Sequence, residues 1–159
     1  MKKIGVLRFP GTNCDRDVIK ALSQVGHACE FVWHKDRFNA KDYSGFVVPG
    51  GFSFGDYLRS GALAARSPVI NGLKEADKAG IPILGICNGF QILCEAGLLP
   101  GVLLKNKGLR FVDSWVGLKK ESSSGTFAKK LPATMKLPVA HGDGCYYAQA
   151  DGLKQVEGD

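Results

Sequence analysis

An apolar run without polar alternation, Ile81-Pro82-Ile83-Leu84-Gly85-Ile86, restricts the fold more than any other part of this sequence. Such a run is typical of a strand that is covered on both faces of a sheet. A helical pattern follows at once, about Gly89–Ala96, and Gly97 ends it. A buried strand that passes directly into a helix is typical of an α/β protein with parallel strands.

The rest of the chain repeats this alternation. Val18, Ile19 and Leu22 recur at helical spacing, and a second helical pattern covers Pro68–Ala79. The expected strands are Lys3–Phe9, Ala28–Trp33, Gly45–Val48, Phe111–Leu118 and Met135–Ala140, and the expected loop is Glu121–Gly125. The alternation predicts an α/β fold with an open, mainly parallel sheet and helices on both faces.

Ligands of such sheets bind outside the carboxyl ends of the strands. This rule places Pro10–Asp15, Pro49–Asp56 and Gly85–Gly89 together at one edge. The chain end, Gln155–Asp159, is interpreted as the middle of a hairpin.

Composition narrows the class of protein. The 159 residues, 45% hydrophobic and 23% charged, fit one globular domain over residues 1–159. The net charge of +6 is spread along the chain. The sequence therefore has no basic arm, and no nucleic-acid partner is expected. No apolar run is long enough for a membrane span or a signal peptide, which predicts a cytoplasmic protein. No His, Cys, Asp or Glu cluster has metal-ligand spacing, so no metal is expected.

The segment Gly85-Ile86-Cys87-Asn88-Gly89 has the spacing of a nucleophile elbow, with cysteine as the nucleophile. The glycines allow strand and helix to pack closely around a tight turn. The positive end of the helix is expected to favour the reactive thiolate. The backbone N–H of Asn88 would point toward a developing oxyanion. A buried structural cysteine beside two turn glycines is the alternative.

Two further segments are candidates for the same site. Gly50-Gly51 follows a strand directly and exposes N–H donors, so it is a candidate second half of an oxyanion hole. His141 lies in a glycine-rich turn and is a candidate general base or a residue of the pocket wall. His27 and His34 flank a strand and are interpreted as surface or edge residues.

Four motifs, Phe9–Asp17, Val48–Arg59, Gly85–Leu93 and Ala140–Gly144, carry a family resemblance that covers essentially the whole chain. The sequence resembles the class I (triad) glutamine amidotransferases, which have a flavodoxin-like fold. Within that class it is similar to the glutaminase subunits of phosphoribosylformylglycinamidine synthases, the amidation enzymes of purine biosynthesis.

The resemblance implies that Cys87 attacks the side-chain amide of glutamine and forms a γ-glutamyl thioester. N–H groups of Gly51 and Asn88 would bind the oxyanion, and Gln91, His141 and Gly142 would contact the substrate. Ammonia would pass to a synthetase subunit, which binds ATP, magnesium and formylglycinamide ribonucleotide. A small third subunit would complete the complex. No cofactor is expected in this chain.

The sequence departs from the family at two places. The family's triad His and Glu lie in a His-Pro-Glu segment that is absent here, and Cys145 stands where arginine is expected. We therefore expect a domain that is incomplete at its C-terminus, with its last elements missing. Two alternatives stay open: a catalytically silent binding subunit of the synthetase, and a stand-alone cysteine hydrolase or glyoxalase with the same elbow.

Overall fold

The computed structural model describes residues 2–121 and 125–157. The chain divides into two compact units, Met1–Val102 and Leu103–Asp159. The expectation of one domain over residues 1–159 stays a prediction. Of the loop expected at Glu121–Gly125, residues 122–124 lie outside the described residues.

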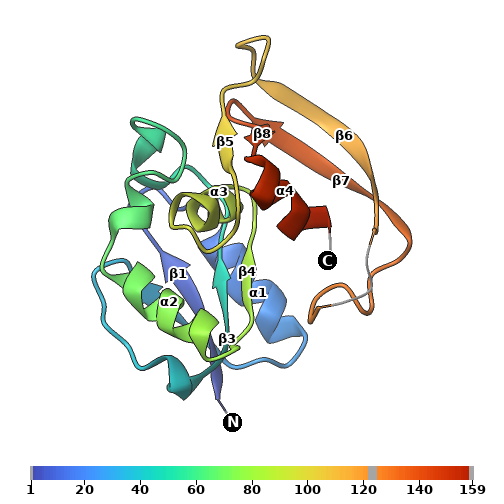
Figure 1. Ribbon diagram of the computed structural model, residues 1–159. Coiled ribbons are helices and arrows are strands. Elements are labelled where there is room, and N and C mark those ends of the chain that lie inside the picture. Colours follow the sequence, from blue (N-terminus) through green and yellow to red (C-terminus); the bar gives the residue numbers. More distant parts are fainter. Residues whose placement is uncertain (1, 122–124, 158–159) are drawn as a thin grey trace. The chain divides into compact units, whose positions relative to one another are not determined.

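The N-terminal unit is built on a four-stranded parallel sheet in the order β2-β1-β3-β4 (Figure 1). Its strands are β1 (Lys3–Arg8), β2 (Cys29–Trp33), β3 (Tyr43–Val48) and β4 (Ile83–Gly85). The strand order reverses direction between β1 and β3, which is the position where open α/β sheets bind ligands.

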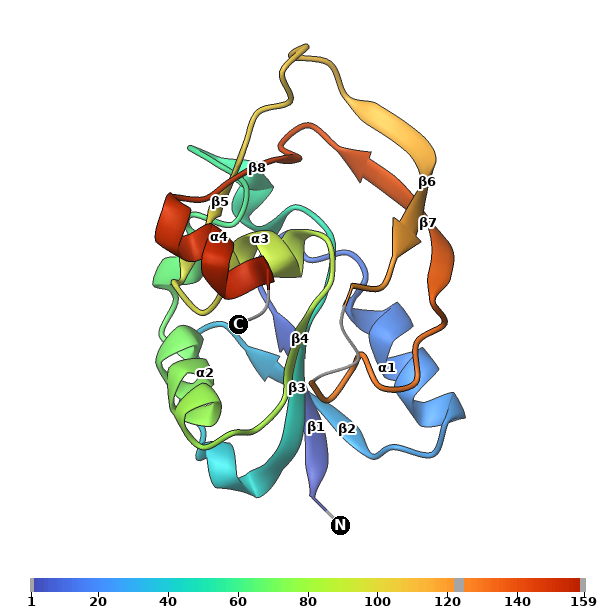
Figure 2. The ribbon, with the colours of Figure 1, turned by 45° about the vertical axis from the view of Figure 1, so that its right-hand side comes forward.

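Three helices connect and cover these strands. They are α1 (Asp15–Gln24), α2 (Val69–Lys78) and α3 (Asn88–Glu95), with short 3-10 turns at Ala40–Asp42, Ser53–Asp56 and Ala64–Arg66. Figure 2 shows α1 on one side of the strands and α2 and α3 on the other. The predicted fold class, a parallel α/β sheet with helices on both faces, is therefore confirmed.

The core of this unit lies between the sheet and its helices. Leu7 and Phe46 from the sheet and Leu73 and Ile92 from α2 and α3 are almost fully buried and belong to one apolar cluster. Burial of an apolar side chain of this size stabilises the fold by roughly 1.5–3 kcal/mol. The cluster thus fixes α3, and with it the turn that precedes α3, against the sheet.

Strand β4 is shorter and more exposed than its apolar sequence predicts. The backbone N–H of Ile81 donates to Ala76 in α2, and Pro82 has no N–H to give to a ladder. Leu84 is 36% exposed, because β4 is the edge of the described sheet.

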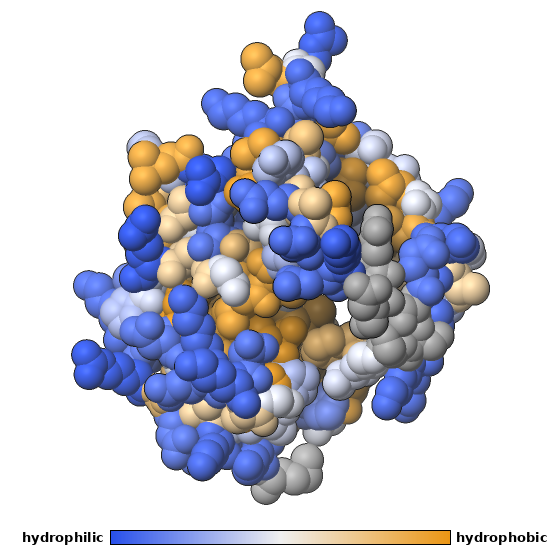
Figure 3. Space-filling model, in the orientation of Figure 1, coloured by the Kyte–Doolittle hydropathy of each residue, from blue (hydrophilic) through white to orange (hydrophobic). Residues whose placement is uncertain are grey.

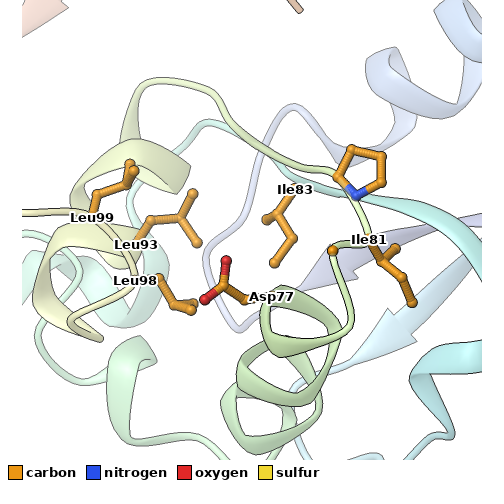
Figure 4. A pocket seen from close by; sticks show the side chains of 8 residues that line it. Asp77, Ile81, Ile83, Leu93, Leu98 and Leu99 are labelled. Atoms are coloured by element: carbon orange, nitrogen blue, oxygen red, sulfur yellow. The ribbon is translucent and has the colours of Figure 1, made fainter. Parts of the chain in front are cut away.

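An apolar groove lies beside β4. Figure 4 shows this groove from close by, and Figure 3 shows it as orange surface. The groove is lined by Asp77, Ile81, Ile83, Leu93, Leu98 and Leu99.

The C-terminal unit contains two strand pairs and a helix. Strand β6 (Val112–Lys119) pairs antiparallel with β7 (Thr134–His141), and β5 (Val102–Leu104) pairs with β8 (Cys145–Tyr147). The first pair confirms the two strands predicted in this region. The hairpin predicted at Gln155–Asp159 is wrong for residues 155–157, because helix α4 runs over Ala150–Glu157. None of the helices within the described residues is both long and apolar enough to cross a membrane.

Of the prediction that His34 is a surface or edge residue, the surface part is wrong, because this residue is buried at 8% exposure, although it directly follows the edge strand β2. Its ring packs edge-on against Trp33 and Phe54. The Ser67 hydroxyl lies 3.5 Å from its Nδ1 atom. Burial lowers the pKa of His34, Lys35 adds to this effect, and Asp36 opposes it.

Acidification is therefore expected to destabilise the protein through His34. The unfolded chain takes up a proton near the ordinary imidazole pKa of about 6.5, while the folded chain takes it up only at lower pH. Stability should fall as the pH decreases through that value. We expect a lower melting temperature at about pH 5.5 than at about pH 7.5, and a smaller decrease in His34→Gln. The exposed His27→Gln variant should keep the full decrease; an equal decrease in His34→Gln would contradict this assignment.

Candidate active site

Cys87 occupies a strained turn between β4 and α3. Its backbone angles are φ 52° and ψ −110°, a combination that L residues rarely adopt, and its side chain is exposed. Such strain costs about 1–3 kcal/mol and is concentrated at functional sites. The geometry thus matches the nucleophile elbow that the sequence predicts at Gly85–Gly89.

The two glycines of the elbow are required by close backbone contacts. A Cβ atom on Gly89 would lie 1.8 Å from the carbonyl oxygen of Val48, and one on Gly85 would lie 2.9 Å from the backbone of Gly89. The Ile86 N–H donates to the same Val48 oxygen at 3.0 Å. Strand β3, the elbow and α3 therefore meet at a distance that only glycine allows.

The strain at Cys87 predicts an unusual order of stability. Glycine accepts the observed backbone angles without strain, so Cys87→Gly should be more stable than Cys87→Ala by about 1 kcal/mol or more. At Cys94, inside α3, the order should be the usual one, with alanine more stable by about 1 kcal/mol. Chemical denaturation of the four variants measures both differences. The same order at both positions would show that the turn at Cys87 is not strained.

The loop after β3 lies directly beside the elbow. A Cβ atom on Gly50 would lie 3.4 Å from the Cβ of Cys87. Gly51 has a φ of 130° and forms a β-bridge with Thr12 of the first loop. A Cβ atom on Gly51 would lie 2.5 Å from the backbone nitrogen of Asn13, so only glycine fits there. The three segments predicted to meet at one sheet edge therefore do meet.

Asn88 is the first residue of α3, so its backbone N–H has no acceptor within the helix. Its side chain is 2% exposed. The amide oxygen accepts from the backbone N–H and the hydroxyl of Ser53, at 3.1 and 2.8 Å. The amide nitrogen donates to Asp56 at 3.2 Å and to Gln91 at 3.0 Å. The side chain thus links the loop after β3 to the elbow.

The first loop supplies Cys14 to the same neighbourhood. Its Sγ atom would lie 3.6 Å from a Cβ on Gly50, the glycine that also contacts Cys87. Burial raises the pKa of Cys14, and the charges of Asp17, Cys87 and Asp15 raise it further. These effects disfavour the thiolate form of Cys14.

His141 and Gly142 belong to the C-terminal unit. Nδ1 of His141 lies 3.0 Å from the amide oxygen of Asn106, and that oxygen also accepts from Gly144 N–H at 2.9 Å. The Asn106 amide nitrogen donates to the His141 carbonyl at 2.9 Å, and its backbone N–H donates to Gly142. Asn106 therefore fixes the turn that carries the predicted histidine.

Sequence reasoning missed Ser53 and Asp56 of the N-terminal unit, which bond to Asn88, and Asn106 of the C-terminal unit, which bonds to the turn of His141. Ser53 and Asp56 lie inside a motif that the sequence singled out, but nothing in the sequence connects them to Asn88, which lies 35 and 32 positions further on. Within residues 2–121 and 125–157, no group of three or more His, Cys, Asp or Glu side chains is placed to hold a metal ion.

A parallel α/β sheet with a cysteine on a strained elbow, beside a glycine-rich loop, is typical of the elbow-cysteine enzymes that act on acyl groups. Comparison with models of known protein families identifies the family more narrowly. The chain belongs to the CobB/CobQ-like glutamine amidotransferase domain family, which matches residues 1–158.

Individual relatives agree with this family. The chain is 47% identical over 156 residues to phosphoribosylformylglycinamidine synthase subunit PurQ of Thermus thermophilus, covering 97% of this chain and 68% of the relative. It is 48% identical over 158 residues to the subunit of the same name from Leptospira interrogans, covering 98% and 72%. The solved structure of PurLQS from Thermotoga maritima matches with a TM-score of 0.85 and 42% identity, covering 95% of this chain and 72% of that chain.

Proposed function

We propose that this chain is the glutaminase subunit of a phosphoribosylformylglycinamidine synthase. It hydrolyses the side-chain amide of glutamine and delivers the ammonia to a synthetase subunit, which converts formylglycinamide ribonucleotide to formylglycinamidine ribonucleotide in purine biosynthesis. The observation that carries this proposal is the exposed Cys87 on its strained turn, beside Gly50-Gly51, in a member of the glutamine amidotransferase family.

The reaction divides into two covalent steps. The Cys87 thiolate attacks the amide carbonyl carbon, and the N–H groups of Gly51 and Asn88 bind the oxyanion that forms; such a donor contributes roughly 10²–10³ in rate. The C–N bond then breaks, the leaving group takes up a proton, and ammonia departs, which leaves a γ-glutamyl thioester. Water cleaves the thioester, releases glutamate and restores the thiol.

The other site residues are assigned to substrate binding. Gln91 is one helical turn after Cys87, on the same end of α3, and is proposed to contact the bound glutamine. His141 and Gly142, in the turn fixed by Asn106, are proposed to hold the amino-acid end of the substrate. The general base is not assigned to this sequence, which has no His-Pro-Glu segment.

The partners follow from the same proposal. The relatives are named as synthase subunits, and the solved structure is named PurLQS, which supports a multisubunit complex. The synthetase subunit would bind ATP and magnesium, and a small third subunit would complete the assembly. This chain itself would need no cofactor and would act in the cytoplasm.

Reconstitution with the synthetase subunit tests the proposal. The synthetase alone should form formylglycinamidine ribonucleotide from ammonia but not from glutamine. Addition of the natively expressed protein should make glutamine an effective nitrogen source. No gain with glutamine, or consumption of peptides or methylglyoxal instead, would contradict the proposal and favour a stand-alone hydrolase or glyoxalase.

The alternative to a glutaminase subunit is a silent subunit that only stabilises the synthetase. This alternative predicts a stable complex and no release of ammonia from glutamine. Complex formation and ammonia release are therefore measured on the same preparation.

A further inference from the structure

The Asn88 side chain has all of its hydrogen-bonding capacity used inside the protein. An asparagine amide can accept two hydrogen bonds and donate two. Here the oxygen accepts twice from Ser53, and the nitrogen donates once to Asp56 and once to Gln91. Asn88 and Ser53 are both 2% exposed. The amide is therefore oriented by its partners and is not available to contact a substrate.

This network joins the two halves of the proposed oxyanion hole. Asn88 supplies one N–H donor from its own backbone, while its side chain holds Ser53, which follows Gly51 by two residues. The loop between them needs such a fixed point, because Phe54 and Asp56 both have a φ of 54°, which is unfavourable for these residues. On its other side the loop bonds to the first loop, where Phe54 N–H donates to Pro10 at 2.6 Å.

We propose that the Asn88 side chain is a positioning group, which sets the distance between the Gly51 and Asn88 N–H donors by holding Ser53 and Asp56. The inference rests on the proposed glutaminase function and adds a role to a residue whose backbone alone was assigned to the site. An oxyanion exists only in the transition state and the intermediate, so a displaced donor should lower kcat and leave KM nearly unchanged.

Asn88→Asp is the sharpest test, because it keeps the size and shape of the side chain. A carboxylate can still accept from Ser53 but cannot donate, and its second oxygen would face the Asp56 carboxylate. We expect kcat for glutamine hydrolysis to fall about 10²-fold or more, with KM changed less than about threefold. Alkylation of Cys87 by iodoacetamide needs no oxyanion hole, so its rate should fall much less than kcat, and only as far as the new carboxylate disfavours the thiolate.

A second substitution should restore the network. In Asn88→Asp combined with Asp56→Asn, the new amide at position 56 donates to the new carboxylate at position 88, which reverses the original hydrogen bond. The double variant should recover at least about tenfold of the kcat that Asn88→Asp loses. Asn71→Asp, on the exposed side of α2, is the matched control and should keep wild-type kcat.

Unchanged kcat in Asn88→Asp, or no recovery in the double variant, would overturn the positioning role. If Asn88→Asp does not fold, Ser53→Ala removes only the 2.8 Å hydroxyl contact and should lower kcat about 3–10-fold at unchanged KM; wild-type kcat in Ser53→Ala would then overturn it. A wild-type protein that neither releases ammonia from glutamine nor supports glutamine-dependent amidation would instead refute the proposed function.

Discussion

Replacing Cys87 by serine is expected to reduce glutamine hydrolysis by at least about 10³-fold and to leave binding to the synthetase subunit unchanged. The serine hydroxyl is a far weaker nucleophile than a thiolate, and the elbow carries no other nucleophilic side chain that could replace Cys87. The side chain is exposed, and the two residues are similar in size, so the fold should not change. Ammonia release and co-elution with the synthetase measure the two properties.

Cys29→Ser is the control for this experiment. Cys29 lies on β2, where its thiol contacts Ser23 and the carbonyl of Ile19, away from the elbow. This variant should keep wild-type activity. Activity that survives Cys87→Ser would show that Cys87 is not the nucleophile, and a complex that is equally stable and equally silent in wild type and variant would favour the binding subunit.

Gly89→Ala is expected to destabilise the protein by more than about 4 kcal/mol, which is most of the stability of a domain at the lower end of the ordinary range. The added Cβ would lie 1.8 Å from the Val48 carbonyl oxygen, and both partners are backbone. Relief would require α3 to move away from β3, which would open the core around Ile92. Yield of soluble protein and chemical denaturation measure the effect.

Gly108→Ala is the matched control for Gly89→Ala. No atom lies within 4 Å of a Cβ at Gly108, and its backbone is not left-handed, so the change in stability should stay within about 0.5 kcal/mol. Folding of Gly89→Ala with near-wild-type stability would mean that β3 and the elbow are not packed as described.

The fold of the N-terminal unit was predictable because its strands and helices are separated by clear breaks, such as Pro10-Gly11 and Gly26. The predictions that failed concern features that depend on contacts between residues far apart in the sequence. Strand β4 begins only at Ile83, since Ile81 N–H is used to cap α2. His34 was not expected to be buried, but Phe54, 20 positions later, packs against its ring.

In the candidate site, too, the local backbone features were predictable and the contacts between distant residues were not. Glycine spacing was enough to predict the turn at Cys87, because only glycine fits on both sides of it. The backbone role of Asn88 followed from its place after the nucleophile. The role of its side chain did not, because an asparagine at a helix start commonly satisfies itself locally. Only the structure places Ser53 and Asp56 against it.

The most direct test of the central claim is the intact mass of the natively expressed protein after reaction with an electrophilic glutamine analogue. We predict a single adduct, located on Cys87 by peptide mapping and prevented by excess glutamine. Cys94 should stay unmodified, since burial raises the pKa of its thiol to about 11. Absence of an adduct, or an adduct on another cysteine that glutamine does not prevent, would contradict the assignment of Cys87 as the glutaminase nucleophile.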